Sequence, residues 1–186
     1  MKRLFDLLLA ILLMVIFSIP LLVLCLMVRL TSKGPAIYWS DRVGRNNQIF
    51  RMAKLRTMKI DAPVIATHLI SDPQALLTPI GGFLRKSSLD EIPQLWNILI
   101  GDMSFVGPRP ALFNQDDLID LRTQKLVHML RPGLTGWAQV NGRDELAIPD
   151  KVKLDAEYLD RQSFRFDVTI LYLTFLKVIR RDGVSH

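Results

Sequence analysis

Cysteine and histidine are both scarce in this chain of 186 residues. Cys25 is its single cysteine, so no intrachain disulfide is possible, which suits a reducing compartment. The three histidines, His68, His128 and His186, lie far apart in the sequence, and no cysteine accompanies them. A zinc site is therefore disfavoured, and a catalytic metal would be a hard ion held by carboxylate oxygens.

Acidic residues are missing from residues 42–59, which carry a large part of the net charge of +6. The basic residues of this stretch are Arg42, Arg45, Arg51, Lys54, Arg56 and Lys59. Such a stretch favours an anionic partner, namely a phosphate, a nucleotide, an acidic lipid surface or nucleic acid. A solvated basic face with no partner explains the same charges.

Charge is absent altogether from residues 7–28, a run long enough for a transmembrane helix. A cleaved signal peptide is disfavoured, because the run is long and no A-x-A site follows it. A straight membrane span is the default interpretation of the length. The remaining interpretation is a re-entrant helix, which breaks midway and leaves the membrane by the face at which it entered.

Two features favour the re-entrant helix. Pro20 removes a backbone donor in mid-run, and the hydroxyl of Ser18 can bond a carbonyl of the preceding turn, so a break is expected near these residues. Both flanks of the run are also basic: Lys2 and Arg3 before it, Arg29 and Lys33 after it. Because positive charge then favours neither end, we expect both ends to be cytoplasmic.

The rest of the chain predicts one small domain of short elements. Strands are expected after the Gly34-Pro35 turn and in the alternating segment of residues 48–58. Helices are expected over residues 94–100, 116–130, 152–159 and 168–179, and irregular segments over 107–110 and 131–143. The last helix is either a core helix or an amphipathic helix at a membrane interface. The expected fold is α+β and mainly helical, with a membrane helix over residues 1–30 and a domain over residues 31–186.

The segment RKSSLDEIPQLWNILIGDMSFVGPRP, residues 85–110, contains the acid pair Asp90-Glu91. Residues 88–91 match a capping box, in which Glu91 would cap a helix. A helix that begins at Asp90 is preferred, because Pro93 then falls in the first turn, where no backbone donor is needed. Asp90 would stay ionised at the positive end of the helix dipole, able to bind Mg²⁺ or to attack an electrophile.

Basic residues flank the acid pair in the sequence: Arg85, Lys86 and Arg109. Guanidinium and ammonium groups neutralise phosphoryl oxygens, so the chemistry suggests phosphoryl transfer on a substrate that meets the membrane. An isolated Asp-Glu pair nevertheless marks a plain helix start more often than a catalytic site.

Four segments in order resemble the bacterial sugar transferases, the monotopic phosphoglycosyl transferases: KRLFDLLLA, DRVGRNNQIFRMAKLRTM, LRKSSLDEIPQLWNILIGDMSFVGPRP and RPGLTGWAQVNGR. The resemblance implies transfer of a sugar-1-phosphate from a UDP-sugar to polyprenol (undecaprenyl) phosphate, with release of UMP. It implies a re-entrant membrane helix and a catalytic domain on the cytoplasmic face of the bacterial inner membrane. The reaction would be the first membrane step of glycoconjugate assembly.

The resemblance also implies a ping-pong mechanism. Asp90 would attack the β-phosphorus and form an aspartyl phosphosugar, with Mg²⁺ held partly by Asp90 and with Glu91 assisting. Substrate contacts are implied for Lys54, Arg56, Arg85, Arg109, Arg131, Gln139 and Arg143. Each of these arginines has a structural ion pair as its alternative role. Ile19 separates Ser18 from Pro20, where the family usually has Ser directly before Pro, and Ala53 and Leu55 stand where aromatic residues are frequent.

Two other hypotheses remain open. In one, the chain is a membrane-anchored module that binds nucleic acid or acidic lipid through residues 42–59, and it would tolerate Asp90→Asn. In the other, it is a Mg²⁺-dependent phosphohydrolase that needs no lipid. The transferase hypothesis predicts membrane lipids as partners and no nucleic acid. The sequence is compatible with a homodimer but does not identify the sugar or the glycan pathway.

Overall fold

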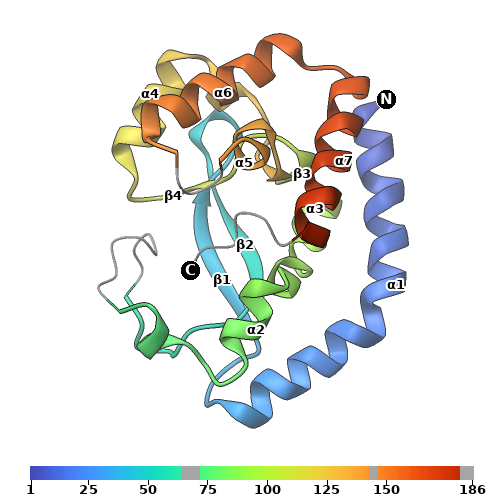
Figure 1. Cartoon of the computed structure of the whole chain (residues 1–186), viewed down its shortest axis with the longest axis vertical. Helices are drawn as coiled ribbons and strands as arrows, with labels where there is room; N and C mark the ends of the chain where they lie inside the picture. Colours follow the sequence, from blue (N-terminus) through green and yellow to red (C-terminus); the bar gives the residue numbers. More distant parts are fainter. Residues whose placement is uncertain (64–71, 143–145, 181–186) are drawn as a thin grey trace.

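A computed structural model describes residues 1–63, 72–142 and 146–180 of the chain (Figure 1). The helices are α1 (Lys2–Thr31), α2 (Gly81–Lys86), α3 (Gln94–Ile100), α4 (Asp116–Gln124), α5 (Trp137–Val140), α6 (Ile148–Arg161) and α7 (Phe164–Arg180). The strands are β1 (Ile37–Val43), β2 (Ile49–Leu55), β3 (Ser104–Val106), β4 (Ala111–Leu112) and β5 (Gly133–Thr135). Short 3₁₀ turns are η1 (Arg45–Asn47), η3 (Gln74–Leu76), η4 (Leu89–Glu91) and η5 (Val127–Met129). The predicted class, α+β and mainly helical, is confirmed.

Two small sheets form the centre of the domain. Strands β2, β1 and β4 form an antiparallel sheet in that order, with Trp39 opposite Ala53. Strands β3 and β5 form a separate parallel pair. Figure 1 shows the β1–β2 hairpin running between the helices, with α1 along one side of the molecule.

Helix α1 is continuous but bent. The hydrogen-bonded helix runs through Pro20, and the Ser18 hydroxyl donates to the carbonyl of Val15 at 2.8 Å, as predicted for the preceding turn. Figure 1 shows a change of direction near the middle of the helix. A bend at an interior proline follows from the lost backbone bond and the crowded ring. The predicted break near Ser18 and Pro20 is thus a bend, not an interruption.

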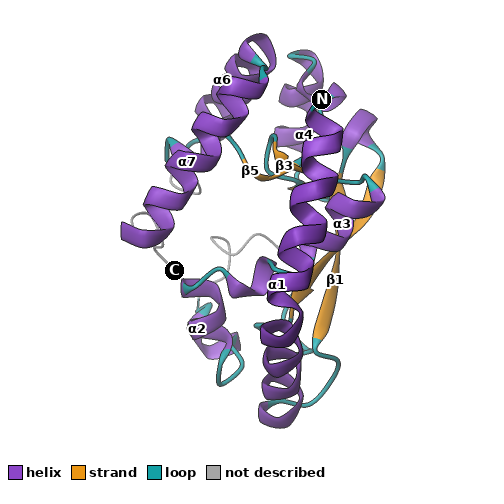
Figure 2. Ribbon diagram, turned by 90° about the vertical axis from the view of Figure 1, so that its right-hand side faces the viewer, coloured by secondary structure: helices purple, strands orange, loops and turns teal. Residues whose placement is uncertain are grey.

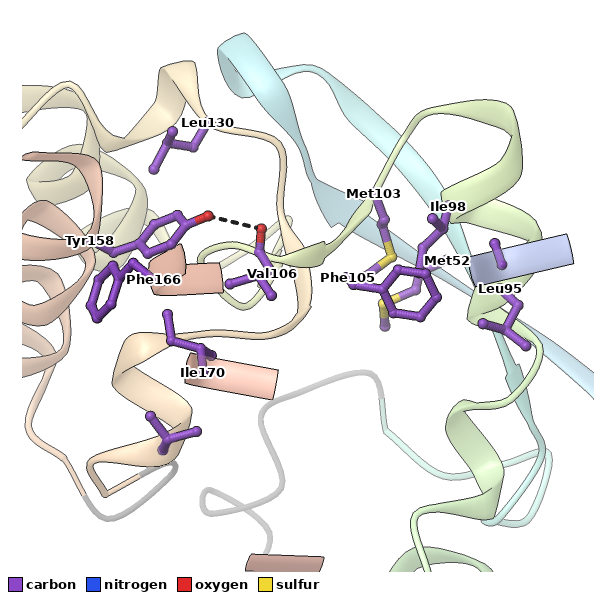
Figure 3. Packing of buried hydrophobic residues seen from close by; sticks show 12 residues of the cluster. Met52, Leu95, Ile98, Met103, Phe105, Val106, Leu130, Tyr158, Phe166 and Ile170 are labelled. Carbon is purple, nitrogen blue, oxygen red and sulfur yellow. Dashed lines mark hydrogen bonds between the residues drawn. The ribbon is translucent and has the colours of Figure 1, made fainter. Parts of the chain in front are cut away.

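Both halves of α1 pack against the same domain. Ala10 belongs to the main core cluster, which Figure 3 shows around Met52, Phe105 and Tyr158. Leu24 and Val28 pack in a second cluster against β2 and α2. Most of the large apolar side chains on the helix remain exposed, and α1 is long and apolar enough to cross a membrane.

Several predicted elements differ in extent from those observed. Helix α3 has the predicted bounds, whereas α6 and α7 are longer than predicted and α4 ends at Gln124. The prediction that residues 131–143 are an irregular loop is wrong for its described part, which contains β5 and α5. Glycines permit this structure: a Cβ at Gly133 would lie 2.1 Å from the backbone nitrogen of Gly107. Strand β5 can therefore lie directly against the 107–110 loop.

Candidate active site

The acid pair lies in the turn η4, between α2 and α3. Helix α3 begins at Gln94, with Pro93 as its N-cap, so the prediction of a helix that starts at Asp90 is wrong. The capping-box alternative also fails, because Ser88 has a left-handed backbone (φ 56°) and makes no side-chain cap bond. The two acids lie instead in a separate tight turn, in which the backbone N–H groups of Glu91 and Ile92 donate to the carbonyls of Ser88 and Leu89.

Asp90 and Glu91 face cations that come from different elements. Lys54, on β2, places its Nζ 3.0 Å from Glu91 Oε1 and 4.0 Å from Asp90 Oδ2. Arg109, which follows β3, reaches the same Glu91 oxygen at 3.4 Å. Glu91 therefore joins Lys54 and Arg109 into one cluster.

Asp90 is only 8% exposed. Burial raises the pKa of Asp90, because a desolvated carboxylate is less stable ionised; Lys54, Arg109 and Arg85 oppose this rise, while Glu91 adds to it. Arg85, on α2, donates from Nε to the Thr57 hydroxyl at 3.0 Å, and burial lowers its pKa although the charge of Asp90 opposes that shift. The structure thus gathers three of the sequence-predicted cations around a buried carboxylate.

The other predicted contact residues are not gathered in this way. Arg56 donates to the carbonyls of Pro35, Ser32 and Gly34, so it fastens the segment after α1 instead of facing the acid pair. Arg131 is exposed, and Gln139 lines a cavity beside Glu91. The predicted contact Arg143 lies outside the described residues.

The basic stretch of residues 42–59 is largely engaged with the protein itself. Arg42 donates to the carbonyl of Pro110, Arg45 to that of Met129, and the Arg51 guanidinium lies 5.4 Å from the centre of the Trp39 ring. Since Lys54 and Arg56 also have internal partners, five of the six basic side chains contact the chain that carries them. This arrangement disfavours a nucleic-acid or lipid-binding module built on the stretch.

The 107–110 loop, which carries Arg109, is held by its backbone carbonyls. Arg122, on α4, donates to the carbonyl of Arg109 at 2.8 Å and binds Asp155 of α6 through two nitrogens, at 3.0 and 2.6 Å. Two prolines in the loop lack a backbone N–H, so the loop has few donors of its own. The bond from Arg122 to the carbonyl of Arg109 therefore helps to fix the path of its backbone. Sequence reasoning missed Arg122 and Asp155, because no local pattern links residues so far apart.

A second set of contacts joins the start of α1 to β3, the strand before this loop. Lys2 Nζ donates to the carbonyl of Val106 at 3.0 Å and binds Asp167 at 2.6 Å. Asp6 is buried and accepts hydrogen bonds from Ser104 Oγ at 2.8 Å and from the Phe105 backbone at 3.3 Å. The membrane-length helix is therefore tied to β3, the strand that leads directly to Arg109.

A cavity of about 600 Å³ lies next to the acid pair. Its polar lining includes Lys86, Ser88, Glu91, Arg109, Gln139 and Lys177. Its apolar lining includes Leu13 and Phe17 of α1 and Leu171, Phe175 and Val178 of α7. The cavity thus connects the cationic cluster with the two helices that carry most of the exposed apolar side chains.

The donor atoms at the site suit a hard cation supplied with further ligands by a substrate. Within the described ranges, no group of three or more His, Cys, Asp or Glu residues gathers to hold a metal. Mg²⁺ is commonly held by one or two carboxylates together with substrate phosphates. Asp90 and Glu91 are the carboxylates of the site that would hold such an ion.

Comparison with known protein families matches residues 1–181 to the bacterial sugar transferase model. The chain is 41% identical to the sugar transferase EpsL of Bacillus subtilis, covering 100% of this chain and 90% of EpsL. It is 38% identical to the UDP-glucose:undecaprenyl-phosphate glucose-1-phosphate transferase of Escherichia coli, over 95% of this chain and 40% of that protein. It is 35% identical to the exopolysaccharide production protein ExoY of Sinorhizobium fredii, over 98% of this chain and 87% of ExoY.

Proposed function

The chain belongs to the bacterial sugar transferase family, and we propose that it transfers a sugar-1-phosphate from a UDP-sugar to a polyprenol phosphate, releasing UMP. The observation that carries the proposal is a buried Asp90 beside Lys54 and Arg85, with Glu91 bridging Lys54 to Arg109. The names of similar proteins supply the substrate classes: the Escherichia coli relative is a UDP-glucose and undecaprenyl-phosphate enzyme.

The donor half-reaction begins with Asp90. One carboxylate oxygen attacks the β-phosphorus of the UDP-sugar, the phosphoanhydride bond breaks, and UMP leaves with the bonding electron pair. The product is an aspartyl phosphosugar. A buried carboxylate with a raised pKa is a better nucleophile than an exposed one, and Lys54, Arg85 and Arg109 are placed to offset phosphoryl charge. Mg²⁺, held by Asp90 with Glu91 as a second oxygen donor, would neutralise the diphosphate.

The acceptor half-reaction regenerates Asp90. A phosphate oxygen of the polyprenol phosphate attacks the phosphorus of the intermediate, and the Asp90 carboxylate leaves, giving a polyprenyl-diphosphate sugar. Glu91 accepts from both Lys54 and Arg109, which supports a role in placing these cations at the phosphoryl group. The proposal also places the reaction on the cytoplasmic face of the bacterial inner membrane.

The packing of α1 supports a re-entrant membrane helix. Arg3, near its start, donates to the carbonyls of Ile98 and Leu99, while Ser32, just past its end, is held by Arg56. Both ends are therefore fastened to the same domain, as a helix that enters and leaves by one face requires. Cysteine labelling from outside intact cells, at introduced residues near both ends, tests this; modification of either end contradicts it.

The function is tested with a panel of UDP-sugars, Mg²⁺ and polyprenol phosphate. Wild type is expected to release UMP and form lipid-linked sugar, and intact mass after exposure to the donor alone should increase by one sugar phosphate. Asp90→Asn preserves the shape of the side chain and should lose both signals. Undiminished turnover by folded Asp90→Asn would remove Asp90 as the nucleophile. Product release without lipid at the full rate would instead indicate a phosphohydrolase.

A further inference from the structure

The cavity beside the acid pair has a lining of two chemical kinds. Charged residues in it include Lys86, Glu91 and Arg109, and apolar residues include Phe17 of α1 and Phe175 of α7. Cations suit a phosphate, and an apolar wall of this extent suits hydrocarbon. The lining therefore matches an amphiphile with an anionic head and an apolar tail.

The apolar part of the lining reaches the molecular surface along α7. Phe175 and Val178 line the cavity, yet both are among the exposed large apolar residues of the chain. Figure 2 shows that α1 and α7 are close near the chain's N-terminus and diverge farther along their lengths. The rings of Phe5 and Phe164 meet at the close end, with centroids 5.2 Å apart. The helices are thus joined at one end and open at the other.

The open end is bordered by side chains suited to a bilayer. The outer face of α1 is apolar, and α7 carries exposed apolar side chains together with the partly buried Lys177, which also lines the cavity. A lysine stem can lie along hydrocarbon while its ammonium group meets phosphate. A lipid could pass from the membrane into the cavity without its tail crossing water.

We propose that this cleft between α1 and α7 binds the polyprenol phosphate acceptor, which rests on the transferase function proposed above. The phosphate lies towards Arg109 and Lys86, and the first isoprene units lie along Phe17 and Phe175. Lys177 supplies positive charge on the α7 wall. Because Glu91 lines the cavity, an acceptor phosphate that enters this way arrives beside Glu91, whose sequence neighbour Asp90 carries the intermediate.

Two exposed aromatic residues of α7 provide a matched test. Phe175 is 62% exposed and lines the cavity, whereas Tyr172 is 60% exposed and is not among its described lining residues. We expect Phe175→Ser to raise the KM for polyprenol phosphate by roughly tenfold or more, because it removes a large apolar contact. Tyr172→Ser should change this KM little. Neither variant should alter formation of the phosphosugar intermediate from the donor alone.

The charge on α7 has its own control. Lys177→Gln should raise the KM for the acceptor and Lys177→Arg should restore it, while Arg165→Gln, at an exposed position near the start of α7, should leave it unchanged. Equal effects of Phe175→Ser and Tyr172→Ser would overturn the proposal in favour of general membrane attachment. An unchanged acceptor KM in Phe175→Ser and Lys177→Gln would overturn it as well. Failure of wild type to form the intermediate would instead refute the transferase function.

Discussion

The buried pair of Arg122 and Asp155 makes a quantitative prediction about stability. Arg122 is 8% exposed and Asp155 is 1% exposed, and Asp155→Asn keeps the shape of the side chain while removing its charge. Burial raises the pKa of Asp155 as it does that of Asp90, but Asp155, unlike Asp90, accepts two short hydrogen bonds from Arg122. In the variant the guanidinium is left buried without its counterion, which costs about 3–5 kcal/mol. A chain of this size loses about 2–4 °C in Tm for each kcal/mol, so the Tm should fall by roughly 6–20 °C.

The same helix supplies the control. Glu157 forms an ion pair with Arg161 one turn away, but the Glu157 side chain is 39% exposed to solvent. Exposed pairs contribute about 0.2–1 kcal/mol, so Glu157→Gln should lower the Tm by about 4 °C at most. Thermal unfolding of both variants in the same detergent measures the difference. Equal shifts would refute the reasoning that burial gives the Arg122–Asp155 pair its effect.

Three further predictions concern the acid pair. The rate of intermediate formation should fall as the pH drops through the raised pKa of Asp90. Because Lys54 lowers this pKa, Lys54→Gln should move the fall in rate to higher pH. The size of the UMP burst, measured against pH, reports both effects. Asp90→Asn should raise the Tm at neutral pH: the folded pKa lies above the unfolded one, so stability falls as pH rises between them, and the amide removes that loss. If the Tm of this variant instead drops, burial is not the dominant influence on Asp90. EDTA should abolish intermediate formation and Mg²⁺ should restore it, as mass spectrometry of the protein can report; activity that persists in EDTA contradicts the assignment of the metal.

The parts of the site that sequence could predict are those that depend on local pattern. The alternation of residues 48–58 correctly placed Lys54 on a strand, and the apolar run of Gln94–Ile100 correctly gave α3. The position of Asp90 relative to that helix was missed, because two start signals overlapped and the chain used neither. Pro93 is the N-cap of α3, and the two acids lie in a separate 3₁₀ turn before it.

Residue roles that depend on distant partners could not be predicted. Arg56 stands next to Lys54 in one motif, yet it faces the carbonyls of residues 32–35 while Lys54 faces the acids. The two residues are separated by one position, at the end of β2. Their different partners depend on where the chain runs after α1 ends. Only the folded path of residues 32–36 brings those carbonyls within reach.

Asp6 shows how the membrane-length helix is coupled to the strand that leads into the 107–110 loop. Its carboxylate is buried and accepts from Ser104 and from the Phe105 backbone, both on β3, just before the loop that carries Arg109. Asp6→Leu would leave those donors buried without an acceptor, at a cost of about 1–3 kcal/mol, whereas Asp6→Asn keeps one oxygen in place.

The two substitutions separate attachment to β3 from insertion into the membrane. Leucine is the more apolar residue, so Asp6→Leu should insert at least as well as wild type if α1 serves only as an anchor. If α1 also holds β3, Asp6→Leu should lower both the Tm and the rate of intermediate formation, and Asp6→Asn should lie between it and wild type. Membrane fraction, Tm and UMP burst are measured on the same preparations. Wild-type values for Asp6→Leu in all three would show that the helix anchors the domain without positioning Arg109.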